Sequence, residues 1–217
     1  MSRAPRGCVT HVCRVAALHG DDGAVGVTAI DKRPVDGPVR VGPLGLRGDV
    51  QADRAHHGGA EKAVYVYDQA EADRWAAELG QDVPPGRFGE NLRLTGVAVD
   101  DAVIGQRWRI GAELELEVTG PRTPCATFGR WLEQGGWVRR FTERARTGAY
   151  LRVVTPGEVR AGDPVTVTQT PGHGVTVSAW FSRGDPADAR TLLAAEREDG
   201  WVMADYLRDY VAAAAGR

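Results

Sequence analysis

The sequence is poor in cysteine and has no long apolar run. Three cysteines occur among 217 residues, and Cys8 and Cys13 have no matching Cys/His group at zinc-binding spacing. So sparse and odd a count predicts reduced thiols and a cytoplasmic protein. No apolar stretch is long enough to span a bilayer, so we expect no membrane association. The segment Met1–Gly7 is positively charged but lacks the apolar stretch of a secretory signal.

An excess of charge of one sign is also missing. The formal net charge is -2 and there is no basic block, which argues against binding of a nucleic-acid polymer while leaving room for a local basic pocket. The chain contains no Walker A loop, dinucleotide-binding fingerprint, His-Glu-x-x-His motif or kinase signature. Histidine, aspartate and cysteine are all present, so composition leaves a cysteine-hydrolase triad open.

Glycine and proline, by contrast, are abundant, and they divide the first three-quarters of the chain into short segments. The length predicts one large domain, or one domain with a small appendage. Short β-branched or alternating runs between regularly spaced turns are typical of a sandwich or a barrel. The predicted strands are Val9–Leu18, Val25–Ile30, Val39–Val41, Ala63–Tyr67, Asn91–Leu94, Trp108–Ile110, Leu114–Val118, Tyr150–Val154 and Pro164–Val167.

Helical periodicity occurs in two parts of the chain. Within the β-rich part it predicts a helix over Asp68–Leu79, capped by Asp68 and Gly80, and another over Thr127–Arg144 that breaks at Gly135–Gly136. After Pro171–Gly174 the pattern predicts three helices, over Thr176–Phe181, Asp185–Glu196 and Trp201–Ala215. We therefore predict a β domain over residues 1–170 and a helical extension over residues 171–217. The extension is too small to be stable alone and should pack on the β part.

Cys125 has the most distinctive setting of any residue. It ends the segment Pro121–Cys125, directly after an alternating strand, and the prolines make this loop stiff. A thiol at a strand exit is placed to bind a metal or to act as a nucleophile. The alternative is a small buried apolar side chain, the usual role of a free cysteine. Arg122 nearby would raise the local potential and favour the thiolate.

The loop Gly48–Gly59 is unusually rich in glycine, aspartate and histidine. Its paired glycines, Gly58 and Gly59, let a backbone approach a ligand closely and expose its N–H groups. His57 could orient a substrate, transfer a proton or ligate a metal. The alternative is a polar turn that carries surface histidines.

Further polar residues stand at strand ends. Lys62 could bind a phosphate or be a solvated surface lysine. Lys32, after the second predicted strand, could add positive charge at the opening of the same binding site. Asn91, after the glycine-rich turn Gly86–Glu90, could hydrogen-bond a heterocycle or cap a turn. Arg152, inside a predicted strand, must face a ligand or an acid. Because rigid scaffolds display functional groups in such places, we expect one shared cleft. It should hold Asp53, His57, Asn91, Arg122 and Cys125.

Taken together, these segments resemble the MOSC family, named for the C-terminal domain of molybdenum-cofactor sulfurases. The resemblance spans about residues 8–170. From His173 onwards the tail resembles the three-helix extension of standalone bacterial members, in a divergent form, and Glu61 stands where the family commonly has aspartate. The motifs are Asp31–Val35, Gly45–Asp49, Gln51–Asp53, His57–Gly59, Lys62–Tyr65, Phe88–Leu92, Pro121–Cys125 and Gly148–Val153.

The resemblance implies a mainly β fold, a closed barrel like the one inserted in pyruvate kinase, and a molybdenum cofactor whose metal is bound by Cys125. Thiolate ligation suits such a metal. It further implies reduction of N-hydroxylated compounds such as hydroxylaminopurines and amidoximes, with Cys125 as a catalytic residue and with His57 and Asp53 delivering protons or orienting the substrate. The residues expected to hold the cofactor are Lys32, Gly58, Gly59, Lys62, Asn91, Arg122 and Arg152.

Two other functions are compatible with the same residues. In one, the protein is a sulfur carrier or sulfurtransferase, and Cys125 holds a persulfide. In the other, the barrel is a metal-free module that binds a small phosphorylated ligand. For the reductase, the chain has no flavin or iron–sulfur motif, so its electrons would come from a separate reductase. In each case the expected partner is a small molecule.

Overall fold

The computed structural model describes residues 7–53, 57–198 and 200–217. Two expectations therefore fall wholly or partly outside the described residues. One concerns the N-terminal segment, of which only Gly7 is described, and the other concerns the Gly48–Gly59 loop, of which Arg54, Ala55 and His56 are not described.

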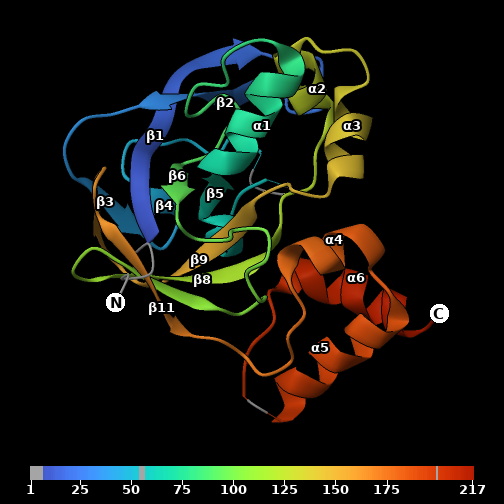
Figure 1. Cartoon of the computed structure of the whole chain (residues 1–217). Coiled ribbons are helices and arrows are strands. Elements are labelled where there is room, and N and C mark those ends of the chain that lie inside the picture. The colour runs from blue at the N-terminus through green and yellow to red at the C-terminus, as the bar shows by residue number, and fades with distance from the viewer. Residues whose placement is uncertain (1–6, 54–56, 199) are drawn as a thin grey trace.

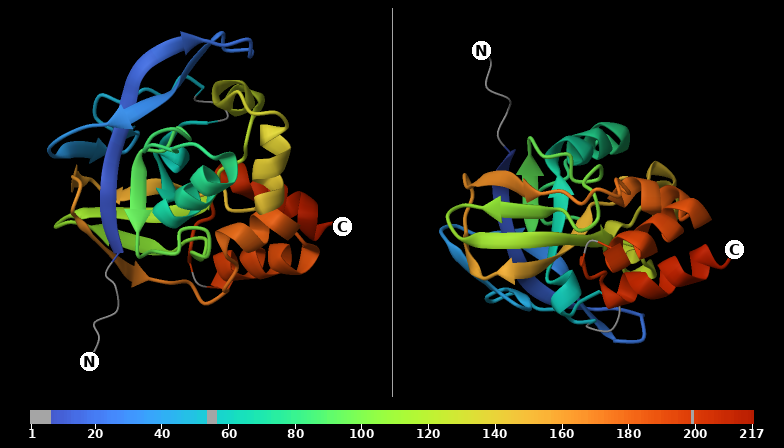
Figure 2. Two further views of the ribbon diagram at one scale, coloured as in Figure 1. Left: turned by 45° about the horizontal axis from the view of Figure 1, so that its top comes forward. Right: turned by 90° about the horizontal axis from the view of Figure 1, so that it is seen from below.

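Within the described residues, seven strands form a closed barrel (Figures 1 and 2). Their order is β11-β7-β8-β9-β5-β6-β1, and pairing of β1 with β11 closes the barrel. Neighbours are antiparallel except β5 and β6, which are parallel because helix α1 makes the crossover between them. The predicted closed β-barrel is confirmed. Its strands are β1 Gly7–Gly20, β5 Val64–Asp68, β6 Leu92–Thr95, β7 Arg107–Ile110, β8 Leu114–Pro121, β9 Ala149–Thr155 and β11 Pro164–Gln169.

The other strands lie outside this ring. β2 (Val27–Pro34) pairs with the far half of β1, and the two form a long hairpin that projects beyond the barrel (Figure 2). β3 (Val39–Gly42) lies between β4 (Gly45–Leu46) and β10 (Gly157–Val159) in a small separate sheet. β4 and β10 were not predicted, because segments this short carry no alternating pattern and form only through their pairing with β3.

Three helices cover one side of the barrel (Figure 1). α1 (Gln69–Leu79) has the predicted caps, since Asp68 accepts a hydrogen bond from the Ala70 N–H and Gly80 has a left-handed backbone. The predicted long helix is indeed broken, into α2 (Ala126–Leu132) and α3 (Trp137–Arg144). Aromatic residues of these helices, of neighbouring strands and of the turn before β6 form a second core beside the barrel interior, centred on Trp75, Phe88, Phe128, Trp137 and Phe141.

The C-terminal extension consists of α4 (Val177–Arg183), α5 (Pro186–Glu198) and α6 (Asp205–Ala215). Its buried residues belong to the same apolar cluster as the barrel interior, so the extension packs on the barrel as expected. The third predicted helix begins later than expected. Trp201 is not helical, and its ring instead lies against His173, with ring centroids 5.4 Å apart. None of the described helices has both the length and the apolar character of a transmembrane span.

Candidate functional site

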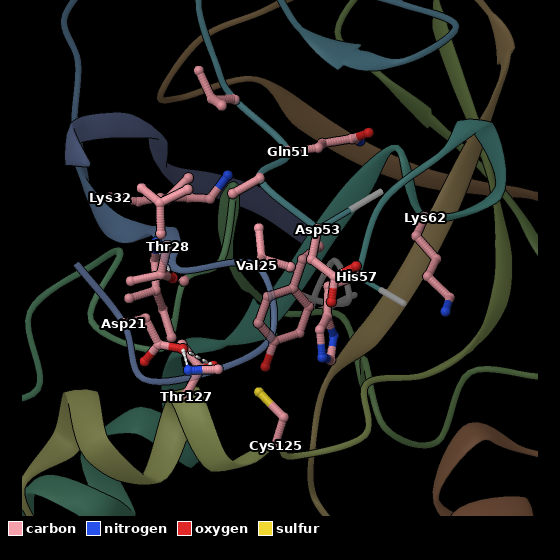
Figure 3. Close-up of a pocket in the computed structure, with 18 of the residues that line it drawn as sticks. Asp21, Val25, Thr28, Lys32, Gln51, Asp53, His57, Lys62, Cys125 and Thr127 are labelled. Carbon is pink, nitrogen blue, oxygen red and sulfur yellow. Dashed lines mark hydrogen bonds between the residues drawn. The ribbon is translucent and has the colours of Figure 1, made fainter. Parts of the chain in front are cut away.

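A cavity of about 350 Å³ opens where the barrel meets the β1–β2 hairpin and the start of α2 (Figure 3). It brings together segments from most of the barrel sequence, so the predicted shared cleft is confirmed. Figure 3 shows Cys125, His57 and Asp53 between the hairpin residue Asp21 on one side and Lys62 on the other. The predicted site residues that line the cavity are Lys32, Asp53, His57, Lys62, Asn91, Arg122 and Cys125.

Cys125 is positioned by strand β8 and helix α2. β8 ends at Pro121, and the chain then reaches Cys125 at the N-cap of α2, with an extended backbone of φ −125° and ψ 171°. The residue is half-buried, packs on one side against the aromatic core and lines the cavity. Cys13, by contrast, is buried in the barrel, where burial raises the pKa of its thiol to about 12. Of these two thiols, Cys125 is the one available for chemistry.

Arg122 is the buried cation of the cavity. It is 4% exposed, and its guanidinium carbon lies 3.9 Å from the centroid of the Phe128 ring. Its backbone N–H donates to the Gly148 carbonyl, which fixes it beside β9. The Nη1 atom has no hydrogen-bond partner among the described residues. Arg122 is nevertheless a lining residue, and its positive charge favours a cavity ligand with an anionic or acceptor group.

His57 is oriented by the chain around it. Its Nδ1 lies 3.3 Å from the hydroxyl oxygen of Tyr150, which comes from β9. Its backbone N–H donates to the Asp53 carbonyl over 2.9 Å. Burial disfavours the phenolate and raises the pKa of Tyr150 to about 12, so the hydroxyl keeps its proton. When that hydroxyl donates to Nδ1, the neutral imidazole carries its own proton on Nε2.

Lys32 and Asn91 line the cavity, but their polar atoms are engaged within the protein. The Asp49 carboxylate accepts from the Lys32 ammonium and, over 2.8 Å, from Asn91 Nδ2. Asn91 Oδ1 accepts from the Tyr65 N–H over 3.1 Å, and Nδ2 also lies 3.4 Å from the Cys13 carbonyl. These contacts favour the structural alternative for Asn91, since they join β1, β5 and the loop that follows β4.

Gly58 and Gly59 are not among the residues that line the cavity. The Gly59 N–H donates to Gln51 Oε1 over 2.9 Å, so it is not exposed to a ligand. The glycine is required by its backbone, which has a φ of 88° before the short 3-10 helix Ala60–Lys62. The expectation that this amide contacts a cofactor is therefore wrong, because the turn itself uses the amide.

Arg152 also lies outside the cavity. Its Nη2 donates to Glu117 over 2.5 Å and to the Val202 carbonyl over 2.7 Å, and its Nη1 lies 3.5 Å from Glu61. It borders a different cavity of about 390 Å³, between the barrel and the extension. The expectation that it shares the Cys125 site is wrong, and the acidic-neighbour alternative is confirmed, because the buried Glu117 requires a cation.

A link between the hairpin and α2 escaped the sequence analysis. Asp21 accepts hydrogen bonds from Thr127 Oγ1 over 2.8 Å and from Arg130 Nε and Nη2 over 2.9 and 2.7 Å. The Arg130 hydrogen bond is the main cause that lowers the pKa of Asp21 to about 2. The link ties the tip of the hairpin to the helix that Cys125 begins. It was missed because 109 positions separate Asp21 from Arg130 and no local pattern connects them.

Side chains that could bind a metal line the cavity, but those described do not form a metal-binding group. Among the residues described, no group of three or more His, Cys, Asp or Glu side chains is arranged to hold a metal ion. A metal at Cys125 would therefore take most of its ligands from a cofactor rather than from the protein.

Comparisons with known proteins agree with this fold and motif set. Residues 53–166 match the family described as MOSC domain. The chain is 32% identical over 176 residues to the uncharacterized protein YflK of Bacillus subtilis, covering 81% of this chain and 79% of YflK. It is also 32% identical over 159 residues to a protein named reductase from Gibberella moniliformis, covering 69% of this chain and 28% of that protein.

Among solved structures, that of YiiM from Geobacillus stearothermophilus has a TM-score of 0.76 to this fold at 20% sequence identity. The match covers 94% of this chain and 97% of that one, so the shared fold includes most of the helical extension. The family match covers more than half of the chain, and YflK extends the similarity over most of it. This protein is therefore a member of the MOSC domain family.

Proposed function

We propose that the chain binds a molybdenum cofactor in the cavity at Cys125 and reduces N-hydroxylated small molecules there. The observation that carries the proposal is that the Cys125 thiol and the buried cation Arg122 line one cavity. A thiolate is a suitable ligand for a redox metal, and a guanidinium N–H forms strong hydrogen bonds to phosphate or other anionic groups. These residues fit the cofactor that the family implies.

The reaction consumes two electrons and two protons, which convert R–NHOH into R–NH2 and water. The bound cofactor supplies the two-electron oxygen-transfer chemistry. A separate reductase delivers the electrons. His57 is the proton donor in its imidazolium form, in which Nδ1–H donates to the Tyr150 hydroxyl oxygen and Nε2–H is the proton that is released. Asp53, whose carbonyl holds the His57 backbone, keeps this residue at the cavity.

An apolar part of the cavity wall defines the substrate. Small apolar side chains of the hairpin, among them Val25, Val27 and Ala29, line the cavity, and so does the buried ring of Phe88 from the aromatic core beside Cys125. Such a wall favours a flat, uncharged ring, while the cations Arg122 and Lys62 of the same cavity are suited to anionic groups. Hydroxylaminopurines and aromatic amidoximes have this character.

The test is metal and pterin analysis of protein from a host that makes the cofactor, combined with a reduction assay on a hydroxylaminopurine and an artificial electron donor. We expect wild-type protein to contain molybdenum and to turn over. Cys125→Ser should abolish turnover while the protein stays folded, and Cys8→Ser, which changes a thiol outside the cavity, should retain activity. Thermal melts of each variant separate lost chemistry from lost fold.

Three outcomes would contradict this proposal. Full activity of Cys125→Ser with molybdenum bound would exclude the thiolate ligand. Retained metal with lost turnover would place Cys125 in catalysis but outside the metal's ligands. Metal-free protein that carries a persulfide on Cys125 would support sulfur transfer instead.

A further inference from the structure

The C-terminal extension reaches the cavity through one aromatic ring. Lys62 lines the cavity, and its Nζ lies 4.1 Å from the centroid of the Tyr206 ring, near the start of α6. The same Nζ is 5.8 Å from the ring of Tyr150 on β9. Tyr206 itself is not a lining residue, so its ring holds the ammonium from behind the cavity wall. Lys62 therefore lies between the barrel and the extension, in contact with an aromatic ring from each.

The Tyr206 ring is fixed in place by the barrel. Its hydroxyl donates to Thr119 Oγ1 over 3.3 Å, and Thr119 Oγ1 in turn donates to the Glu61 carbonyl over 2.7 Å. Gly120 permits this approach, because a Cβ atom there would lie 2.8 Å from the Tyr206 hydroxyl oxygen. The ring thus packs against a strand position that has no side chain, and its orientation is set by β8.

A second contact joins the same two segments. α6 begins after Ala204, which has no capping side chain, and the Asp205 N–H donates instead to Glu61 Oε2 over 2.6 Å. A carboxylate is a favourable partner for the N–H groups at the start of a helix. Consecutive residues of the 3-10 turn, Glu61 and Lys62, therefore contact consecutive residues of α6, Asp205 and Tyr206. This double contact holds the turn that carries Lys62 against the start of α6.

We infer that Tyr206 is a positioning residue of the ligand site: its ring holds the Lys62 ammonium at the cavity, where it binds the anionic group of the ligand. Aromatic faces attract ammonium groups, and the attraction is stronger where water is excluded. Burial lowers the pKa of Lys62 below its usual value, consistent with a partly desolvated ammonium. Without the ring, the flexible four-carbon stem could place the charge elsewhere. The helical extension would then be part of the ligand site and not only a structural addition.

The test uses the full chain and inorganic pyrophosphate as the anionic probe, with affinity measured by calorimetry. Tyr206→Leu removes the ring and should weaken pyrophosphate binding about tenfold, and Tyr206→Phe, which keeps the ring, should stay within about twofold of wild type. Tyr210→Leu is the matched control, since Tyr210 lies on the same helix with its side chain 71% exposed. It should bind as wild type does.

A double-mutant cycle with Lys62→Met distinguishes positioning from general stabilisation. If Tyr206 acts through Lys62, Tyr206→Leu should cause no further loss of affinity in the Lys62→Met background. Additive losses would overturn the inference, as would wild-type affinity in folded Tyr206→Leu protein or no pyrophosphate binding by the wild type. Should Tyr206→Leu not fold, Tyr206→Met, which fills the space without an aromatic face, takes its place.

The inference rests on the proposed function only for the identity of the natural ligand. The pyrophosphate experiment needs neither cofactor nor turnover. Coupled losses in a protein that fails to reduce N-hydroxylated compounds would refute the proposed function and leave the role of Tyr206 intact. If the protein reduces N-hydroxylated compounds but the two losses of pyrophosphate affinity are additive, the proposed function stands and the role of Tyr206 is refuted.

Discussion

At the residue scale, the chemistry of the cavity depends on neighbours that keep reactive groups in one state. Tyr150 is the clearest case, because its buried hydroxyl stays protonated and lies 3.3 Å from Nδ1 of His57. The sequence placed Tyr150 in a recognisable motif, Gly148–Val153, but gave no reason to connect it with a histidine 93 positions earlier. A side-chain contact of this kind becomes visible only once β9 and the histidine loop are placed in space.

Tyr150→Phe tests this contact. Because the variant removes the hydroxyl that orients His57, we expect kcat for N-hydroxyl reduction to fall about tenfold, with KM little changed. The control is Tyr65→Phe, which also lines the cavity and also loses one hydrogen bond, to the Thr147 carbonyl over 2.7 Å, without touching His57. Equal losses in the two variants would show that His57 orientation is not the cause.

Asp100 is a second residue whose state is set by burial. It is 2% exposed and accepts the Gly148 N–H over 2.8 Å, and burial raises its pKa from 3.8 to about 7. The folded protein therefore holds a proton between about pH 4 and pH 7 that the unfolded chain has released. The contribution of this group to stability is complete below pH 4 and is lost as the pH rises to 7.

Asp100→Asn should remove this dependence. Each pKa unit corresponds to ~1.4 kcal/mol. Between pH 4 and pH 8 the free energy of unfolding of the wild type should therefore fall by several kcal/mol relative to that of the variant. Urea unfolding at both pH values measures the difference. Asp101→Asn, a change at the exposed neighbouring carboxylate, should leave the difference from wild type nearly constant. A constant difference for Asp100→Asn as well would mean that Asp100 is ionised in the folded protein.

At the scale of elements, local signals placed most helices and strands, and pairing partners decided the rest. The caps Asp68 and Gly80 and the break at Gly135–Gly136 are local features, and each occurs where predicted. β4 formed without such a signal, because it depends on β3 alone. The site residues were predictable where they stand at strand exits, as Cys125 does. Arg152 was assigned to the wrong site, because the sequence of a strand does not show whether an arginine in it contacts a ligand or a buried acid.

The link between the hairpin and α2 is an element-scale device that can be tested. Asp21→Asn weakens the ion pair with Arg130, so the apolar wall that carries Val25 should be held less firmly over Cys125. We expect KM for a hydroxylaminopurine to rise several-fold with kcat largely kept. Since the pKa of Asp21 is about 2, KM of the wild type should not follow Asp21 titration between pH 5 and 8.

Asp22→Asn provides the matched control for that link. Asp22 is the exposed neighbour in the same turn, and the same chemical change there should leave KM unaltered. A small acyclic amidoxime should also respond less to Asp21→Asn than a hydroxylaminopurine does, because it contacts less of the wall. A uniform rise in KM for both substrates would argue for a general loosening of the hairpin instead.

At the scale of the whole molecule, the division of the chain into two domains stays a prediction. The β-barrel and the helical extension nevertheless share one apolar core. Buried residues of all three extension helices, among them Trp180, Leu192 and Leu207, belong to the same apolar cluster as Trp108 and Leu116 of the barrel. Composition showed where the pattern changes, near Pro171. It could not show that two patterns share one core, because that depends on which faces meet.

A shared core predicts one cooperative unfolding transition. Leu207 is 2% exposed on α6, so Leu207→Ala should lower the free energy of unfolding by about 2–5 kcal/mol. The loss should appear equally in far-ultraviolet circular dichroism, which follows the helices, and in tryptophan fluorescence, which includes the barrel residue Trp108. Tyr210→Ala, on the exposed side of the same helix, should shift neither curve by much. Two separate transitions, with the fluorescence transition of the barrel unchanged in Leu207→Ala, would show instead that the extension unfolds on its own. The contact between Tyr206 and Lys62 would then be lost while the barrel stays folded.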